Sequence, residues 1–358
     1  MPANGTTPAD QMEGVQLASG WKIGARVAKV KGGTGSNFGV CYSATRGEEK
    51  AFVKAIDFRR AFASVDLLTA VSRLAKEVAW EKDVLEFCGQ HGLSRIVRLL
   101  AHEYVLLDEF GGDDTKRVSC LVMEVGDGDL RGELNLNQDR PASWAMFVIR
   151  DVALAIDQLH RKGIAHLDVK PSNVISMKAS PDNTSPMKLG DLGRVVRKGI
   201  DGPFDAEAWP GDRTYQPPEK WYGYKSAQWN DERESADAFL VGSLLVFLFA
   251  GLSMGKLIHS ELPDAYKPEN YRGTFDRDLI DVLVRAQSQV LSTHLLPYLP
   301  ARFTVELLGI AMELTNPDPT KRGDPGARKQ GAVGMDRYHQ KFFRIAKRLE
   351  FDERIAIA

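Results

Sequence analysis

The stretch His166-Leu-Asp-Val-Lys-Pro-Ser-Asn173 (HLDVKPSN) is followed in the sequence by Gly190-Asp-Leu-Gly193 (GDLG). The two segments contain two carboxylates, Asp168 and Asp191, one carboxamide, Asn173, and one ammonium group, Lys170. Side chains of these types handle protons and bind hard metal ions such as Mg²⁺ through oxygen. The order and spacing of these residues determine the interpretation of the rest of the chain.

The pattern H-x-D-x-K-x-x-N, followed by D-L-G, resembles that of the eukaryotic-type protein kinases. Phosphoryl transfer requires a carboxylate that orients the attacking hydroxyl and accepts its proton, together with oxygen ligands for magnesium. The resemblance implies that Asp168 is the catalytic base and that Lys170 lies near the transferred phosphate. It also implies that Asn173 and Asp191 are the metal ligands, with ATP and Mg²⁺ as cofactors.

Composition supports a globular protein and excludes several other classes. Of 358 residues, 43% are hydrophobic and 27% are charged, and 47 Lys and Arg balance 48 Asp and Glu. A broad polybasic surface is thus excluded, and we expect no nucleic-acid partner. The three cysteines, Cys41, Cys88 and Cys120, form neither a disulfide framework nor a zinc-ligand spacing. This indicates a reducing compartment, and we expect a cytoplasmic protein.

The sequence predicts an α+β protein with the bilobal kinase-like fold. Residues 1–20 lack the features of a signal peptide and are expected to form a flexible leader. Residues 21–126 mix strand-like runs with one long helical pattern, which predicts a small N-lobe with a β-sheet and one main helix. Residues 127–330 predict a large, mostly helical C-lobe, and residues 331–358 a C-terminal helical extension.

Residues 238–254 are apolar over nearly the length of a membrane-spanning helix. Such a helix needs roughly 20 apolar residues, and Asp237 and Lys256 closely flank this run. We therefore expect a helix buried in the C-lobe and no membrane partner. By the resemblance, Asp237 caps the backbone of the catalytic loop.

The N-lobe is expected to bind the nucleotide. Gly33, Gly35 and Gly39 form a glycine-rich turn whose bare backbone can lie over phosphates, although the usual G-x-G-x-x-G spacing is interrupted by one residue. The segment Ala51-Phe-Val-Lys54 resembles the strand whose lysine holds the α- and β-phosphates. Glu81 is the expected partner of Lys54, because the neighbouring apolar residues then share one helix face, and Glu77 is the alternative.

Residues 121–130 (LVMEVGDGDL) resemble the hinge between the two lobes. In this alignment Met123 is the gatekeeper, and the Glu124 carbonyl and the Val125 amide bind the adenine edge. Asp127 or Asp129 is expected near the ribose. Without the resemblance, the segment is only an apolar strand that enters a Gly/Asp turn.

Several further positions distinguish this chain within the family. Pro217-Pro218-Glu219 stands where the family has A-P-E, and Arg322 stands where the buried partner of the glutamate belongs. Leu167 replaces the arginine that usually needs an activation-segment phosphate, so we expect activity without that phosphorylation. Asp212 stands where serine/threonine kinases carry a threonine. Phe52 occupies a position where the family has a small residue against the adenine.

The leading functional hypothesis is an ATP-dependent protein kinase that transfers the γ-phosphate to a protein hydroxyl. Lys170 favours serine/threonine specificity, whereas Asp212 and a motif-level likeness to the Wee/Myt group keep tyrosine specificity open. A small-molecule phosphotransferase of the aminoglycoside-kinase type is an alternative, and a pseudokinase scaffold is another. The sequence leaves the protein substrate and the oligomeric state open.

Overall fold

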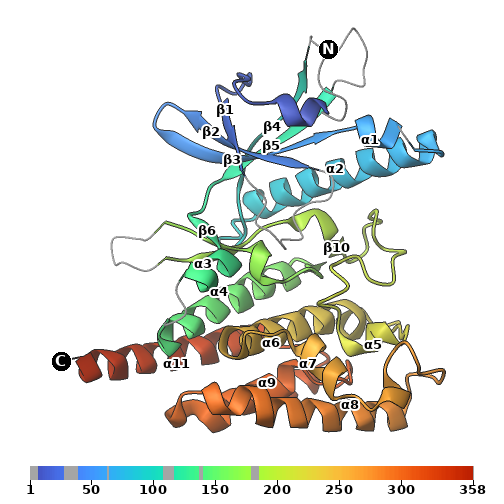
Figure 1. Ribbon diagram of the computed structural model, residues 1–358, viewed down its shortest axis with the longest axis vertical. Coiled ribbons are helices and arrows are strands. Elements are labelled where there is room, and N and C mark those ends of the chain that lie inside the picture. Colours follow the sequence, from blue (N-terminus) through green and yellow to red (C-terminus); the bar gives the residue numbers. More distant parts are fainter. Residues whose placement is uncertain are drawn as a thin grey trace. The chain divides into compact units, whose positions relative to one another are not determined.

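A computed structural model describes residues 7–27, 39–62, 64–107, 117–136, 140–178 and 185–357. The chain divides into two compact units, Met1–Asp127 and Gly128–Ala358. The division falls one residue beyond the expected boundary. The expected α+β class is confirmed, because the first unit is built on a β-sheet and the second is mostly helical (Figure 1).

The first unit contains an antiparallel sheet with the strand order β1-β2-β3-β5-β4 and one long helix, α2 (Figure 1). Its elements are β1 (Lys22–Arg26), β2 (Val40–Arg46), β3 (Glu49–Asp57), α1 (Arg59–Phe62), α2 (Leu67–Gln90), β4 (Leu99–Leu106) and β5 (Arg117–Glu124). Helix α2 begins where the carboxylate of Asp66 accepts a hydrogen bond from the Thr69 backbone. Successive side chains of β3 alternate between the two faces of the sheet.

Residues 7–20, expected to belong to a flexible leader, are instead folded against the sheet. A short 3₁₀ helix, η1 (Pro8–Gln11), precedes Met12 and Leu17, which are buried in the same core as Val53 of β3. The Tyr42 hydroxyl donates to the Ala9 carbonyl at 2.7 Å. The expectation was wrong because these few apolar residues, widely spaced among polar ones, cover a sheet face that would otherwise expose apolar side chains to water.

The second unit is mostly helical, with short paired strands near its beginning. Its strands are β6 (Gly128–Asp129), β7 (Ile164–Ala165), β8 (Val174–Ser176), β9 (Met187–Leu189) and β10 (Val196–Arg197). Its α-helices are α3 (Leu130–Leu136), α4 (Ala142–His160), α5 (Pro218–Trp221), α6 (Ser235–Ala250), α7 (Met254–Glu261), α8 (Arg277–Val290), α9 (Thr304–Leu314), α10 (Pro325–Arg328) and α11 (Met335–Ile357).

Helix α6 forms the centre of the second unit. Every residue from Ser235 to Val246 is buried, which explains why the helix is apolar on all sides. It ends at Gly251, whose φ of 73° is the left-handed conformation that favours glycine. The apolar run at residues 238–254 is therefore not one helix, because α7 begins at Met254 and is bent by 83° from α6.

A membrane-spanning test gives a limited result for the described residues. No single helix is both long enough and apolar enough to cross a bilayer. The bent pair Asn230–Ala250 and Met254–Glu261 passes the test together, by length and composition only.

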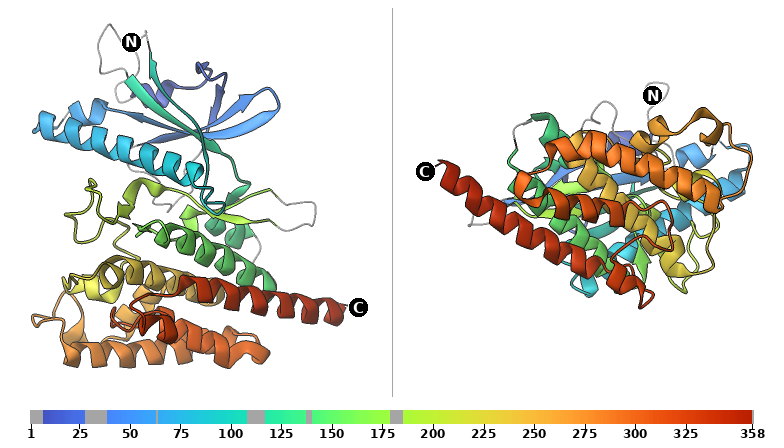
Figure 2. Two further views of the ribbon diagram at one scale, coloured as in Figure 1. Left: turned by 180° about the vertical axis from the view of Figure 1, so that it is seen from behind. Right: turned by 90° about the horizontal axis from the view of Figure 1, so that it is seen from below.

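The C-terminal helix α11 lies along α4 (Figure 2). The expected helical spacing of apolar residues is present, and their side chains are buried: Met335, Tyr338, Phe342, Ile345 and Leu349. Near its end, the Glu353 carboxylate accepts hydrogen bonds from the backbone and the hydroxyl of Ser143, at the start of α4. Residues 335–357 thus form an integral layer of the second unit.

Candidate active site

The first unit contains a buried ion pair on the sheet-to-helix face. Lys54 Nζ of β3 lies 2.7 Å from Glu81 Oε1 and 2.8 Å from Glu81 Oε2 of α2. Glu77, the alternative partner, instead has its Oε1 2.8 Å from Nε of the exposed Arg73, one turn earlier in the same helix. Glu81 follows Glu77 by four positions, and only Glu81 belongs with Val78 and Val84 to the buried residues of α2.

The two faces of β3 have different surroundings. Ala51, Val53 and Ala55 face the core that includes residues 9–23. Phe52 and Lys54 lie on the opposite face, and the strand register places Phe52 directly across from Met123 of β5. Met123, the predicted gatekeeper, therefore has a phenyl ring and not a small side chain as its cross-strand neighbour.

The glycine-rich turn is described only at its end. Gly33 and Gly35 lie outside the described residues, whereas Gly39 immediately precedes β2. A Cβ atom at Gly39 would lie 3.2 Å from Cγ of Lys54 and 3.4 Å from the Ala55 carbonyl. The missing side chain thus allows the backbone to lie close to the stem of Lys54.

The predicted hinge residues lie at the end of the first unit and the start of the second. Met123 is buried, and the Glu124 backbone N–H donates to the Arg98 carbonyl at 3.0 Å. Val125 follows the end of β5 and is half-buried. Asp129 Oδ1 accepts a hydrogen bond from the Gly132 backbone at 2.7 Å, so this carboxylate also caps the first turn of α3.

The loop that contains Asp168, predicted to be the catalytic loop, is held by hydrogen bonds to Asp237 of α6. One carboxylate oxygen accepts the N–H of Leu167 at 2.7 Å, and the other accepts the N–H of His166 at 2.8 Å. Leu167 has a φ of 60° and is fully buried. Both bonds supply part of the stabilisation that this left-handed backbone requires in a residue other than glycine.

Asp168 is the centre of a buried polar cluster. Lys170 Nζ lies 3.0 Å from its Oδ2, and the Asn173 amide donates to the same oxygen at 3.0 Å. Burial raises the pKa of Asp168, the charge of Lys170 opposes the rise, and the nearby charge of Asp191 adds to it. A raised pKa makes the carboxylate a better proton acceptor.

The residues Asn173 and Asp191 have the donor atoms that magnesium prefers. The amide nitrogen of Asn173 donates hydrogen bonds to the carbonyl and the carboxylate of Asp168, at 2.8 and 3.0 Å. The amide oxygen Oδ1 is therefore the atom that can bind a cation. Asp191 follows β9 and has a φ of 55°. Its negative charge lies close enough to Asp168 to raise the pKa of that carboxyl. Within the described ranges no cluster of three or more His, Cys, Asp or Glu side chains forms a metal site. Two protein ligands suit Mg²⁺, which retains water and substrate phosphates as its other ligands.

Two further contacts hold this region together. Asp212 stands where the family resemblance places a threonine that contacts Lys170 and the catalytic aspartate. Its backbone N–H donates to Asp168 Oδ1 at 2.8 Å, and its carboxylate lies 3.4 Å from Lys170 Nζ. The second contact, between His160 Nε2 and Asp237 Oδ2 at 2.9 Å, has no sequence signal, because the two residues are 77 positions apart.

The expected scaffold pair is also present in the second unit. Arg322 donates two hydrogen bonds to Glu219, at 2.8 and 2.6 Å, and both side chains are fully buried. The guanidinium also donates to the carbonyls of Asn316 and Ser235. Removing two charges from water costs free energy, and this cost is offset only when the remaining donors of the pair are also hydrogen-bonded.

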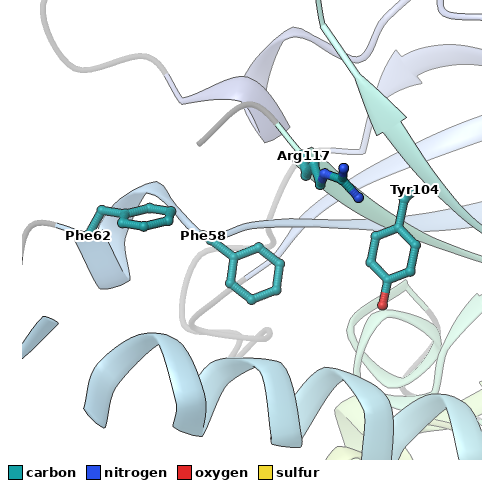
Figure 3. Close-up of a pocket in the computed structure, with 4 residues that line it drawn as sticks. All are labelled: Phe58, Phe62, Tyr104 and Arg117. Atoms are coloured by element: carbon teal, nitrogen blue, oxygen red, sulfur yellow. The ribbon is translucent and has the colours of Figure 1, made fainter. Parts of the chain in front are cut away.

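The first unit also contains a cavity of about 240 Å³ (Figure 3). Its lining residues are Phe58 between β3 and α1, Phe62 of α1, Tyr104 of β4 and Arg117 at the start of β5. None of them belongs to the predicted nucleotide-binding set. The cavity therefore does not coincide with the Lys54–Glu81 ion pair.

A family model and several curated proteins match the chain. The family model of the protein kinase domain matches residues 29–322. Among curated proteins, Rho-associated protein kinase 1 of rabbit, mouse and human is 33% identical over 103 residues. The match covers 29% of this chain and 7% of each relative, so the chain spans a small fraction of their length.

Proposed function

This chain belongs to the protein kinase family, and we propose that it transfers the γ-phosphate of ATP to a hydroxyl group of a protein. The observation that carries the proposal is the polar cluster around Asp168. It combines a buried carboxylate of raised pKa, a cation at 3.0 Å and two oxygen donors for magnesium. These are the groups that phosphoryl transfer requires.

In the proposed reaction, the hydroxyl oxygen forms a bond to the γ-phosphorus while the bond between that phosphorus and the β–γ bridging oxygen breaks. The electron pair leaves with ADP, and Asp168 accepts the hydroxyl proton. Lys170 supplies positive charge beside Asp168, and Lys54, oriented by Glu81, is proposed to hold the α- and β-phosphates. Magnesium, held by Asn173 and Asp191, would neutralise charge on the phosphates.

We propose serine or threonine as the acceptor. Lys170, two residues after Asp168, supports this specificity through the family resemblance. Asp212, in place of the usual threonine, makes tyrosine the alternative. Phosphoamino-acid analysis of the product distinguishes the two.

The proposal is tested with the full chain, γ-labelled ATP, Mg²⁺ and casein as a generic acceptor. We expect the wild-type protein to label itself or casein, and the isosteric variant Asp168→Asn to lose at least about 100-fold in rate, because it lacks the proton acceptor. The matched control is Asp201→Asn, an exposed aspartate of the same unit, which should retain the wild-type rate.

Unaltered labelling by Asp168→Asn, with the same melting temperature as the wild type, would contradict the assignment. Absence of transfer by the wild-type protein would support a pseudokinase instead. Transfer to aminoglycosides but not to casein would support a small-molecule phosphotransferase.

A further inference from the structure

Residues 166–173 and 209–216 together carry four charged side chains, those of Asp168, Lys170, Asp212 and Arg213. Three of them form one ion-pair cluster, because Lys170 Nζ lies 3.0 Å from Asp168 Oδ2 and 3.4 Å from Asp212 Oδ2. Arg213 lies outside this cluster. Its side chain is exposed, and it has no carboxylate partner among the residues that the structure describes.

The position of Arg213 is fixed by the residues on both sides of it. The Tyr215 N–H donates to the Asp212 carbonyl at 3.0 Å, so Arg213 and Thr214 are the central residues of a tight turn. The Asp212 N–H donates to Asp168 Oδ1 at 2.8 Å. Because consecutive Cα atoms are about 3.8 Å apart, Arg213 begins directly beside a residue that touches the proposed proton acceptor.

A second guanidinium reaches the same turn from α3. Arg131 donates to the Tyr215 hydroxyl at 3.1 Å. The carboxylate of this helix, on Glu133, lies 3.1 Å from Arg140 and is therefore already paired with a cation. The charge that α3 brings to the turn is thus positive.

We propose that Arg213 is a specificity-determining residue, and that the favoured protein substrates carry acidic side chains next to the hydroxyl that is phosphorylated. A guanidinium forms two parallel hydrogen bonds with a carboxylate, which gives both strength and defined geometry. A basic side chain in the same place would instead meet a like charge. This inference rests on the proposed function, because it names the substrate class of the same site.

The test uses the full chain and three synthetic peptides that share one serine and differ in the two residues on each side of it, which are glutamate, alanine or lysine. A parallel set has tyrosine as the acceptor. We expect the wild-type kcat/KM to be at least about tenfold higher for the glutamate peptide than for the lysine peptide, mainly through a lower KM. Higher ionic strength should reduce this ratio, because the guanidinium is exposed to solvent.

Two variants of Arg213 remove or reverse its charge. Arg213→Gln should reduce the ratio between the glutamate and lysine peptides to about threefold or less, and Arg213→Glu should reverse the preference. The matched control, Arg348→Gln, removes an exposed arginine of α11 and should keep the wild-type ratio. Because both arginines are exposed, all three variants should keep the wild-type melting temperature.

Equal kcat/KM values of the wild type for the glutamate and lysine peptides would overturn the inference, and so would an unchanged ratio in Arg213→Glu. A wild-type preference for the lysine peptide would also overturn it. That result would point instead to the acidic residues earlier in the same segment, Asp201, Asp205 and Glu207.

The two proposals fail separately. If the wild-type protein phosphorylates casein but does not distinguish the peptides, this inference alone fails. If it transfers no phosphate at all, the proposed function fails, and the fluorescence anisotropy of dye-labelled glutamate and lysine peptides decides the inference. Tighter binding of the glutamate peptide that is lost in Arg213→Gln would then support it, and equal binding of the two peptides would contradict it.

Discussion

At the scale of single residues, the carboxylate of Asp237 joins three backbone and side-chain groups of the second unit. It accepts the N–H groups of His166 and Leu167 and lies 2.9 Å from the His160 ring. Because Asp237 is fully buried, its negative charge is screened little by water. The protonation state of His160 therefore affects the stability of the loop that carries Asp168.

This gives a pH dependence of defined sign. Burial lowers the pKa of His160, but the hydrogen bond and charge of Asp237 outweigh it and raise the pKa above its ordinary value. Protonated His160 thus stabilises the fold fully below about pH 6.5, and this contribution is lost as the pH rises through the folded-state pKa. We expect the stability advantage of the wild type over His160→Gln, measured by urea unfolding, to shrink as the pH rises. Parallel pH profiles of the two proteins would refute this.

At the scale of elements, close packing at α6 determines the core of the second unit. A Cβ atom at Gly242 of α6 would lie 2.6 Å from Thr315 Cγ2 and 2.7 Å from Leu314 Cβ, at the end of α9. The two helices therefore approach more closely than a larger residue would permit. Cores that are already well packed do not accept additional atoms without displacement.

Gly242→Ala is therefore expected to destabilise the protein by about 1–3 kcal/mol, the usual cost of overpacking. The matched control is Gly309→Ala in α9, where an added Cβ meets nothing within 4 Å. That change should stabilise the helix by up to about 1 kcal/mol, since alanine is a better helix former than glycine. The measurement is thermal or urea unfolding, and equal effects of the two variants would contradict the packing argument.

At the scale of the whole molecule, folded structure extends beyond the family match at both ends. The kinase domain model matches residues 29–322, yet residues 7–20 cover the sheet of the first unit and α11 packs on α4 in the second. Each of the two units thus completes its core with a flanking segment. Met12 and Tyr338, one from each flank, are fully buried.

Met12→Ala is expected to destabilise the protein by about 2–4 kcal/mol, because it removes a fully buried side chain and leaves a cavity. Glu13→Ala, at the neighbouring exposed position, should change the free energy of unfolding by less than about 0.5 kcal/mol. Both are measured by denaturant unfolding. A wild-type midpoint for Met12→Ala would show that the segment before the sheet contributes nothing to the core.

Much of the architecture could be predicted from the sequence, for reasons that are visible in particular residues. The HLDVKPSN and GDLG segments identify the family, and the apolar spacing around Glu81 separates it from Glu77. The site roles of these residues stay predictions. The packing of residues 7–20 was not predicted, because it depends on which sheet face lacks a cover. The contact of His160 with Asp237 was not predicted, because the two residues are 77 positions apart and come together only in the folded chain.

Helix α6 carries a consequence for biosynthesis. Its apolar surface is covered partly by α4, which is synthesised earlier, and partly by α9, which is synthesised later. While the ribosome is still adding residues 251–314, α6 has only part of its final cover, and the nascent chain exposes apolar surface to water. Chains that stall in this interval are the form most exposed to aggregation and to capture by chaperones.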